Sequence, residues 1–313
     1  MQQKKVLITD DVHQILLEGL AAAGYECNYQ PNINLDEVRQ QIGAYEGLII
    51  NSKILVNKTL LDAAKNLKFV ARLGSGMEII DKKYAAQLGV SVYNSPEGNR
   101  NAVAEHAVGM LLALANHLVR ADREVRNFSW QREKNRGFEL RGKTIGIVGF
   151  GHTGSSFAKK LSGWETKILA YDKYLSDGYA ANFSNVEEVA PEQIQSEADI
   201  ISFHLPLTDE TRHLGDKNYF EKCKDGVVII NTSRGQVLNT EDLLAALRNK
   251  KIGGACLDVF ENERTATFSE QEKRLYAELY SLENVVFSPH IAGWTVESKR
   301  ALSEVLLQKI LTN

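Results

Sequence analysis

The sequence predicts an α/β protein with two doubly wound parallel-sheet domains, and three observations lead to this prediction. Short apolar runs alternate with helical patterns along most of the chain, which is typical of parallel strands covered by helices. The 313 residues exceed what one ordinary core needs, which favours two domains. Three closely spaced glycines lie between two apolar runs near the middle of the chain, as in a tight strand–turn–helix unit.

The first hundred residues already contain a series of strands and helices. Residues 13–23 show a helical pattern, and a longer one, 102–126, is predicted to carry the chain into the second domain. The last segment, 295–311, is amphipathic, and we expect it to return to the first domain. The predicted strands of this part are 4–9, 47–51, 69–73 and 90–93.

The second half repeats the alternation with longer apolar runs. Helical patterns at 216–223 and 240–250 separate several of its strands. The predicted domains are therefore 1–100 plus 292–313, which is discontinuous, and 101–291. The predicted strands of the second domain are 144–148, 168–171, 199–204, 226–231, 253–259 and 285–288.

The glycine unit predicts a nucleotide site. Glycines at positions 149, 151 and 154 let the backbone approach a pyrophosphate, and the following helix offers unpaired N–H donors at its start. Asp172 lies about 20 residues further on, where an acid accepts hydrogen bonds from a ribose 2′-hydroxyl. Its carboxylate would repel a 2′-phosphate, so NAD is favoured over NADP. The alternative is a tight turn that holds no ligand. The predicted contacts in the turn are Gly149, Gly151, His152, Thr153 and Gly154.

Composition narrows the class of protein. A net charge of −3 argues neither for nucleic acid nor for an anionic membrane as a partner, and we expect neither. No run of about 18 apolar residues is present, and the chain starts directly with a predicted strand, so we expect no membrane span and a cytoplasmic protein. The three cysteines lie far apart without a CxxC pair, so we expect neither a disulfide nor a metal site.

Three polar residues follow three successive predicted strands of the second domain. Ligands of open α/β sheets collect beyond the carboxyl ends of strands. Arg234 can hold a carboxylate with its planar guanidinium group. His290 can exchange a proton near neutral pH, and Glu263 would hydrogen-bond the imidazole and fix its tautomer. The set suits reduction of a keto acid, although each residue alone is more often structural.

Four motifs together resemble one known family. The sequences GFGHTG with Asp172, NTSRGQVLN, LDVFENE and SPHIAGWT are similar to those of the D-isomer-specific 2-hydroxyacid dehydrogenases, and most to the D-3-phosphoglycerate dehydrogenases among them. The resemblance covers nearly the whole chain. It implies a flavodoxin-like substrate domain, a Rossmann NAD-binding domain, NAD as hydride carrier and a homodimer formed through the NAD-binding domain. It also implies that Arg234, Glu263 and His290 are the catalytic residues.

The same resemblance implies further contacts. Asp258 is expected to hold the nicotinamide carboxamide, helped by the chain near Thr232 and Gly293. The first-domain glycine loop is expected to bind the substrate carboxylate through its backbone. The remaining implied contacts are Val103 at the nicotinamide, His204 and Pro206 near the adenosine, and Ser75 and Gly76 at the substrate.

Three features depart from the phosphoglycerate dehydrogenase pattern. Asn51 stands where that group carries an arginine for the substrate phosphate, which leaves Ser52 and Lys53 as the expected anion contacts. Arg264 replaces a proline, and the segment 264–281 is longer and more charged than expected, so we predict a surface helix there. The chain stops soon after its last helix, so we expect a short form without a regulatory domain.

The sequence therefore predicts an NAD-dependent enzyme that interconverts a small D-2-hydroxy acid and its 2-keto acid. The first candidate is a D-3-phosphoglycerate dehydrogenase of serine biosynthesis. The alternative within enzymes is a reductase of glyoxylate, hydroxypyruvate or another 2-keto acid, because Asn51 puts the phosphate in doubt. The alternative from another class is an NAD(H)-sensing interaction protein similar to corepressors, since one fold serves several functions. The predicted catalytic residues favour an enzyme.

Overall fold

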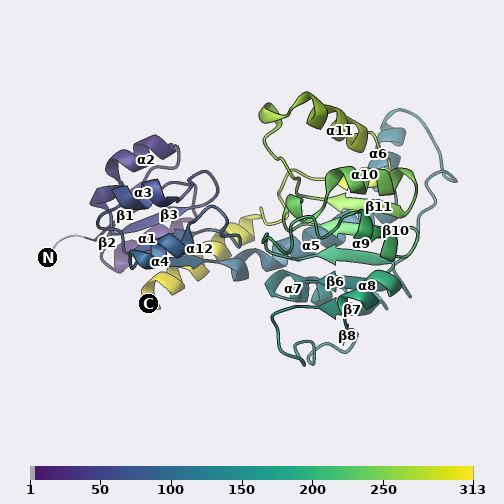
Figure 1. Cartoon of the computed structure of the whole chain (residues 1–313), viewed down its shortest axis with the longest axis horizontal. Helices are drawn as coiled ribbons and strands as arrows, with labels where there is room; N and C mark the ends of the chain where they lie inside the picture. The colour runs from purple at the N-terminus through teal and green to yellow at the C-terminus, as the bar shows by residue number, and fades with distance from the viewer. Residues whose placement is uncertain (1–3, 313) are drawn as a thin grey trace. The chain divides into compact units, whose positions relative to one another are not determined.

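The computed structural model describes residues 4–312 and contains two compact units. Unit 1 comprises Met1–Arg100 and Trp294–Asn313, and unit 2 comprises Asn101–Gly293. Each unit contains one parallel sheet with helices packed against it (Figure 1). The predicted α/β class with two parallel-sheet domains is confirmed.

Unit 1 has a five-stranded parallel sheet in the order β2-β1-β3-β4-β5, which is the flavodoxin-like order. The prediction missed β2, whose alternating polar and partly buried residues lie at the edge of the sheet. The strands are β1 (Lys4–Ile8), β2 (Tyr25–Tyr29), β3 (Gly47–Ile50), β4 (Phe69–Arg72) and β5 (Ser91–Asn94). The helices are α1 (Gln14–Ala22), α2 (Leu35–Gln41), α3 (Lys58–Ala63), α4 (Lys82–Gln87) and α12 (Val296–Thr312).

The sheet of unit 1 is buried on both faces. Successive residues of a strand point to opposite sides, so each strand contributes side chains to two separate cores. In β3, Leu48 and Ile50 pack into one core and Ile49 packs into the other. The second core contains Leu306 and Ile310, so α12 covers this face of the sheet together with α1. The amphipathic C-terminal segment thus completes the core of unit 1.

Unit 2 has a seven-stranded parallel sheet in the order β12-β11-β10-β9-β6-β7-β8. The chain runs outward from β6 through β7 to β8, then returns to β9 on the other side of β6, which makes the carboxyl ends of β6 and β9 a topological switch point. The strands are β6 (Thr144–Val148), β7 (Lys167–Tyr171), β8 (Val186–Glu188), β9 (Ile200–Phe203), β10 (Val227–Asn231), β11 (Ile252–Leu257) and β12 (Val285–Phe287). The helices are α5 (Pro96–Ala115), which begins in unit 1, α6 (Leu118–Arg126), α7 (His152–Lys160), α8 (Pro191–Glu197), α9 (Lys217–Lys222), α10 (Thr240–Arg248) and α11 (Glu270–Tyr280).

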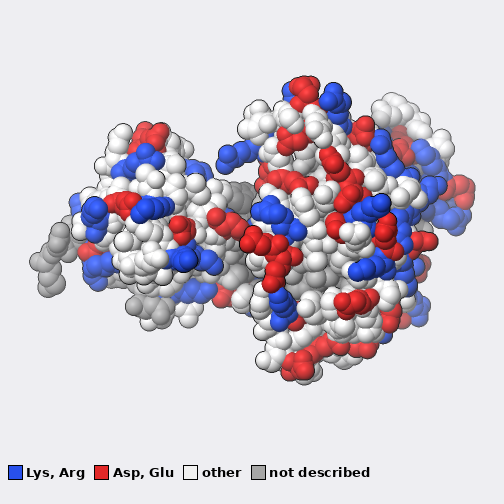
Figure 2. All heavy atoms as spheres, in the orientation of Figure 1, with Lys and Arg blue, Asp and Glu red and all other residues white. Residues whose placement is uncertain are grey.

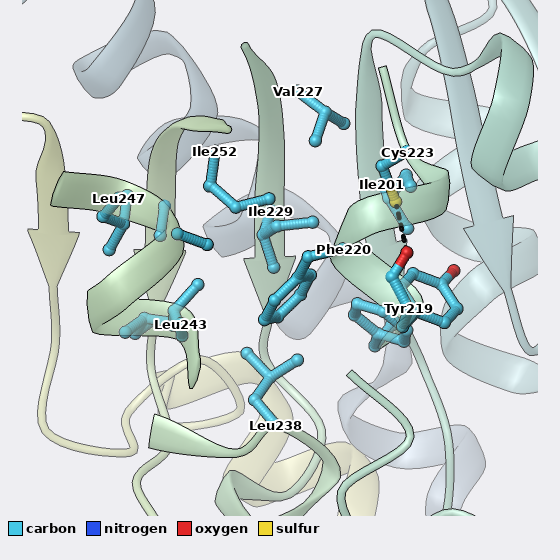
Figure 3. Packing of buried hydrophobic residues seen from close by; sticks show 14 of the residues in the cluster. Ile201, Tyr219, Phe220, Cys223, Val227, Ile229, Leu238, Leu243, Leu247 and Ile252 are labelled. Carbon is cyan, nitrogen blue, oxygen red and sulfur yellow. Dashed lines mark hydrogen bonds between the residues drawn. The ribbon is translucent and has the colours of Figure 1, made fainter. Parts of the chain in front are cut away.

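The core under α9 and α10 fixes the position of β10 (Figure 3). Ile229 of β10 is completely buried against Phe220 and Leu243 of these helices. Cys223 closes α9 by donating its Sγ–H to the Tyr219 carbonyl at 3.3 Å. The strand that precedes Arg234 therefore cannot move without disturbing this core.

One predicted element was wrong. Residues 102–126 were expected to form a single helix, whereas the structure has α5 and α6, separated at His117. His117 has φ 52°, in the left-handed region, which a continuing right-handed helix does not allow. The apolar spacing continues across the break, so periodicity alone does not reveal it. The surface helix predicted within 264–281 is α11.

No single helix within residues 4–312 is long and apolar enough to cross a membrane, although α5 and α6, bent by 60°, pass the same length and composition test as a pair. Acidic and basic side chains are interspersed over the visible surface of each unit (Figure 2). This mixing agrees with the small net charge of −3.

Candidate functional site

The predicted residues of unit 2 lie beyond the carboxyl ends of neighbouring strands. The glycine turn follows β6, and His204 follows β9. Three further residues, Arg234, Asp258 and His290, come after β10, β11 and β12. Since all these strands are parallel, their carboxyl ends share one edge of the sheet, which is where ligands of such folds bind.

Glycine stands at the three positions of the turn for different structural reasons. Gly149 has φ +93°, and a Cβ there would lie 2.4 Å from the His204 carbonyl oxygen. A Cβ on Gly154 would lie 2.0 Å from the Gly149 carbonyl oxygen. At Gly151, which precedes α7 as its N-cap, a Cβ would meet nothing within 4 Å. Gly149 and Gly154 therefore permit close backbone contacts of the turn. Gly151 leaves open space at a helix N-terminus, where a phosphate could approach.

Asp172 ties the glycine turn to the end of β7. Its Oδ2 accepts a hydrogen bond from the Phe150 N–H at 2.8 Å, and its Oδ1 accepts from the Tyr174 N–H at 2.9 Å. The neighbouring Lys173 is paired with Glu210. The Leu175 N–H also donates to Asp172 Oδ1, at 3.3 Å. A carboxylate offers about four lone-pair sites, so these three bonds leave acceptor capacity for a ribose hydroxyl.

Two buried polar atoms near this edge have no hydrogen-bond partner within residues 4–312: His204 Nδ1 and Thr232 Oγ1. The other imidazole nitrogen of His204, Nε2, is 2.9 Å from Ser202 Oγ. Burial lowers the pKa of His204 to about 3, so the ring is neutral at physiological pH. Buried polar groups are normally paired, and a polar ligand at this edge would pair these two. The open turn and these two atoms fit a dinucleotide.

His290 and Glu263 form a direct pair. His290 Nδ1 lies 2.8 Å from Glu263 Oε2. Burial raises the pKa of Glu263, but the His290 hydrogen bond and the nearby positive charges of His290 and Arg234 outweigh it, so the pKa lies below the usual value. An ionised Glu263 can only accept, so Nδ1 carries the proton and donates it. The Nε2 atom is then left to exchange a proton with a substrate.

Arg234 lies on a loop that hydrogen bonds hold in place. The side chain of Asn231, which is completely buried, donates from Nδ2 to the Arg234 carbonyl at 2.9 Å and accepts from the Ser233 hydroxyl at 2.8 Å. A Cβ on the next residue, Gly235, would lie 1.9 Å from the backbone carbonyl of Phe260. The loops that carry Arg234 and Glu263 therefore touch through their backbones, and glycine permits the contact.

Asp258 is completely buried and holds the loop that carries His290. Its Oδ1 accepts from Ser288 Oγ at 2.6 Å and from the Ile291 N–H at 2.9 Å. Its Oδ2 accepts from the Ala292 N–H at 2.9 Å. The expected contact of Asp258 with a carboxamide stays a prediction, and in the structure this carboxylate binds its own chain. The contact of Ser288 with Asp258 was not predicted, because a serine two residues before a histidine gives no signal of its own.

Unit 1 contains the predicted glycine loop after β4. The Ser75 hydroxyl donates to Asn99 Oδ1 at 3.1 Å, and the Ser75 carbonyl accepts from Asn94 Nδ2 at 2.7 Å. Arg72 also holds the loop, because its guanidinium group donates a hydrogen bond to the Gly76 carbonyl. Within residues 4–312 the backbone N–H groups of Ser75 and Gly76 donate to no acceptor. Two such groups in one loop can bind a carboxylate.

The predicted phosphate contacts of unit 1 do not form a cluster of positive charges. The Asn51 N–H donates to Asp10 Oδ2 at 2.9 Å, and its carbonyl accepts from Arg72 Nε at 2.9 Å. Lys53 Nζ donates to the Pro31 carbonyl at 2.5 Å. Ser52 is exposed. Their contact with substrate stays a prediction.

The other predicted residues occupy varied places in unit 2. Val103 is buried on α5. The Pro206 carbonyl accepts from Thr211 Oγ1 at 2.6 Å. His152 and Thr153 form the first turn of α7. Gly293 closes unit 2. No group of three or more His, Cys, Asp or Glu side chains within residues 4–312 is arranged to hold a metal ion.

Comparisons with known proteins identify relatives of both the sequence and the structure. Residues 108–292 match the model of the family described as D-isomer specific 2-hydroxyacid dehydrogenase, NAD binding domain. The chain is 34% identical over 307 residues to a D-3-phosphoglycerate dehydrogenase of Archaeoglobus fulgidus, covering 98% of this chain and 56% of that protein. The chain thus spans little more than half of that relative's length.

Two further relatives match over most of their own length. A hydroxypyruvate reductase of Thermotoga maritima is 37% identical over 279 residues, which cover 89% of this chain and 88% of that protein. The D-lactate dehydrogenase of Aquifex aeolicus, solved with NAD and lactic acid, is 25% identical with a TM-score of 0.85 and covers 99% of this chain and 95% of its own.

The different surroundings of Gly154 and Gly151 lead to a first prediction. Gly154→Ala places a methyl group against the Gly149 carbonyl, so we expect urea denaturation to show a loss of about 1–3 kcal/mol in the free energy of unfolding. Gly151→Ala meets open space and should change this free energy by less than about 1 kcal/mol. It should nevertheless weaken NADH binding, measured by fluorescence titration, because the methyl group occupies the space of the pyrophosphate. Equal losses of stability in both variants would contradict this account.

The lowered pKa of His204 leads to a second prediction. Below pH 6.5 the unfolded chain protonates this imidazole, whereas the folded protein does so only near pH 3. Stability is therefore lost as the pH falls through this window, by at most about 1.4 kcal/mol per pH unit. In His204→Gln the loss between pH 6.5 and 4.5, followed by urea denaturation, should be smaller. An unchanged slope in His204→Gln would refute the assignment.

Proposed function

This chain belongs to the D-isomer-specific 2-hydroxyacid dehydrogenase family, and from that premise we propose that it transfers hydride between NAD and a small D-2-hydroxy acid. The observation that carries the proposal is the His290 Nδ1 to Glu263 Oε2 distance of 2.8 Å on loops at the NAD-binding edge of the sheet. A histidine held in one tautomer by a carboxylate is the arrangement that general acid–base catalysis requires.

Bound in its reduced form, the cofactor would supply the hydride added to the second carbon of the keto acid; in its oxidised form it would accept the hydride removed from the hydroxy acid. In the proposal Arg234 holds the substrate carboxylate through its guanidinium group. His290 gives its Nε2 proton to the carbonyl oxygen as the alcohol forms, and Glu263 stabilises the imidazolium in the reverse direction. Asp172 accepts hydrogen bonds from the ribose, while Gly151 leaves room for the pyrophosphate.

Within this class, D-3-phosphoglycerate is the first candidate substrate. The motifs around Arg234 and His290 and the relative from Archaeoglobus fulgidus support it. A reaction of serine biosynthesis would follow from this substrate.

The second candidate is an unphosphorylated acid such as hydroxypyruvate or glyoxylate. Asn51 carries no charge where the phosphoglycerate dehydrogenase pattern has an arginine, and the Lys53 ammonium donates a hydrogen bond to the Pro31 carbonyl. The relative from Thermotoga maritima, named a hydroxypyruvate reductase, supports this candidate. The His290–Glu263 pair favours either enzyme over an NAD(H)-sensing interaction protein.

We also propose a homodimer formed through unit 2, in a cytoplasmic protein. Large apolar side chains are exposed along α6 and directly after it, and a second copy of the chain would cover them. They are Leu118, Val119, Val125, Phe128 and Trp130, of which Phe128 is fully exposed and Trp130 is 77% exposed.

Oxidation of NADH by the purified protein tests the enzyme proposal. The acids to compare are 3-phosphohydroxypyruvate, hydroxypyruvate, glyoxylate, pyruvate and 2-ketoglutarate. Activity with at least one is expected, and the preferred acid decides between the two candidates. His290→Asn should lower kcat by roughly 10²–10⁴-fold, because the proton donor is lost, while NADH affinity stays within a few fold.

A matched control is His13→Asn. The His13 side chain accepts a hydrogen bond from the Ile15 N–H at the start of α1, a role in which asparagine serves equally well. This variant should keep the wild-type kcat. Turnover by His290→Asn at the wild-type rate, or NADH binding without turnover of any acid, would refute the proposed reaction.

Analytical ultracentrifugation tests the homodimer. Trp130→Glu should shift the protein toward the monomer, since a charge would be buried at the interface. Leu88→Glu changes an exposed apolar residue of unit 1 and should leave the mass in solution unchanged. A monomeric wild-type protein at micromolar concentration would contradict the proposal.

A further inference from the structure

The loop that carries His290 has an unfavourable backbone conformation. His290 has φ +57°, in the left-handed region that residues with a Cβ rarely adopt. Such a conformation is energetically unfavourable and persists only where the surroundings determine it fully. Three hydrogen bonds to Asp258 do so here: the His290 N–H donates to its carbonyl at 2.7 Å, and the Ile291 and Ala292 N–H groups donate to its carboxylate.

The Asp258 carboxylate is in turn held by a chain of hydrogen bonds that starts on α5. His106 Nε2 lies 2.8 Å from Ser288 Oγ, and Ser288 Oγ lies 2.6 Å from Asp258 Oδ1. All three residues belong to unit 2. The direct distance from His106 Nε2 to Asp258 Oδ1 is 3.6 Å, so the serine hydroxyl makes the close contact.

The direction of this chain follows from the number of protons available. A hydroxyl has one proton, and an ionised carboxylate can only accept. At 2.6 Å the Ser288 proton is therefore on the bond to Asp258. The Ser288 oxygen then accepts from His106, so Nε2 of His106 carries a proton. The sulfur of Met110, 3.6 Å from Ser288 Oγ, is a much weaker acceptor and does not compete.

We propose that His106 and Ser288 are positioning residues for His290. His106 orients the Ser288 hydroxyl, the hydroxyl fixes the Asp258 carboxylate, and the carboxylate fixes the backbone on which His290 stands. The result is the 2.8 Å alignment of His290 Nδ1 with Glu263. Neither His106 nor Ser288 touches the reacting atoms in this proposal, which rests on the proposed acid–base role of His290.

Four variants separate the hydrogen bonds from simple packing. Ser288→Ala and His106→Phe each remove one bond of the chain. Ser288→Thr keeps the hydroxyl, and His106→Gln keeps an N–H donor close to the position of Nε2. Thr166→Val is a matched control, because Thr166 Oγ1 is buried in unit 2 and has no partner within residues 4–312.

The first measurement is amide hydrogen exchange, followed by mass spectrometry, in the peptide that contains residues 288–293. Ser288→Ala and His106→Phe should speed exchange of the 290–292 amides by roughly tenfold or more, because the loop opens more often. Ser288→Thr, His106→Gln and Thr166→Val should exchange as the wild type does. Equal exchange in all variants, or fast exchange in Ser288→Thr as well, would overturn the proposal.

The second measurement uses turnover of the best acid found with the wild type. Ser288→Ala and His106→Phe should lower kcat by roughly 10–100-fold through misplacement of His290, with NADH affinity and KM changed far less. The solvent deuterium isotope effect on kcat should rise, since proton transfer becomes slower, and a variant that is only less stable would not show this. An unchanged kcat together with fast exchange would mean that the loop is held but does not position His290.

The two measurements also separate this proposal from the proposed function. If the wild type reduces none of the acids, the proposed function fails, and hydrogen exchange still decides whether His106 and Ser288 hold the loop. If the wild type turns over and the exchange rates do not differ, the proposed function stands and the positioning role is wrong.

Discussion

The buried carboxylate of Asp258 is the constraint on which the geometry of the site depends. A carboxylate without solvent must be matched by hydrogen-bond donors, and here the donors come from Ser288 and from the backbone of Ile291 and Ala292. Satisfying one charge therefore requires the loop after β12 to fold around the end of β11. The position of His290 follows from this requirement, because its own N–H bonds the same residue.

Glycine contacts carry this constraint to the neighbouring loops. Gly235 lies against the Phe260 carbonyl, so the Arg234 loop cannot move away from the Glu263 loop without leaving a gap. The aromatic rings of Phe260, Phe268 and Tyr276 pack together and join α11 to the same segment. The long segment after Glu263 thus packs against the loop that carries Glu263, and its helix packs on the sheet of unit 2 through the buried Tyr276 and Leu279.

The sequence predicted the strands that contain apolar runs, among them the edge strands β5 and β12. It missed the edge strands β2 and β8, because their residues are partly exposed and several are polar. It also missed the break at His117, since a left-handed residue leaves no trace in apolar spacing. Arg234, Glu263 and His290 were predicted because charged residues after strands are conspicuous. Ser288 and His106 were not, since their importance arises only from distances across the fold.

The resemblance of the motifs does not determine whether the substrate carries a phosphate. Residues that follow strands keep their positions because the sheet determines them. Of the predicted phosphate contacts, Asn51 follows β3 directly and its backbone is held by Asp10 and Arg72, whereas Lys53 is exposed. Lys53 is held by the Pro31 carbonyl, yet an exposed lysine exchanges such a partner for a phosphate at little energetic cost. Under the proposed function we therefore expect charge at these positions, and not the catalytic geometry, to decide between the two candidate acids.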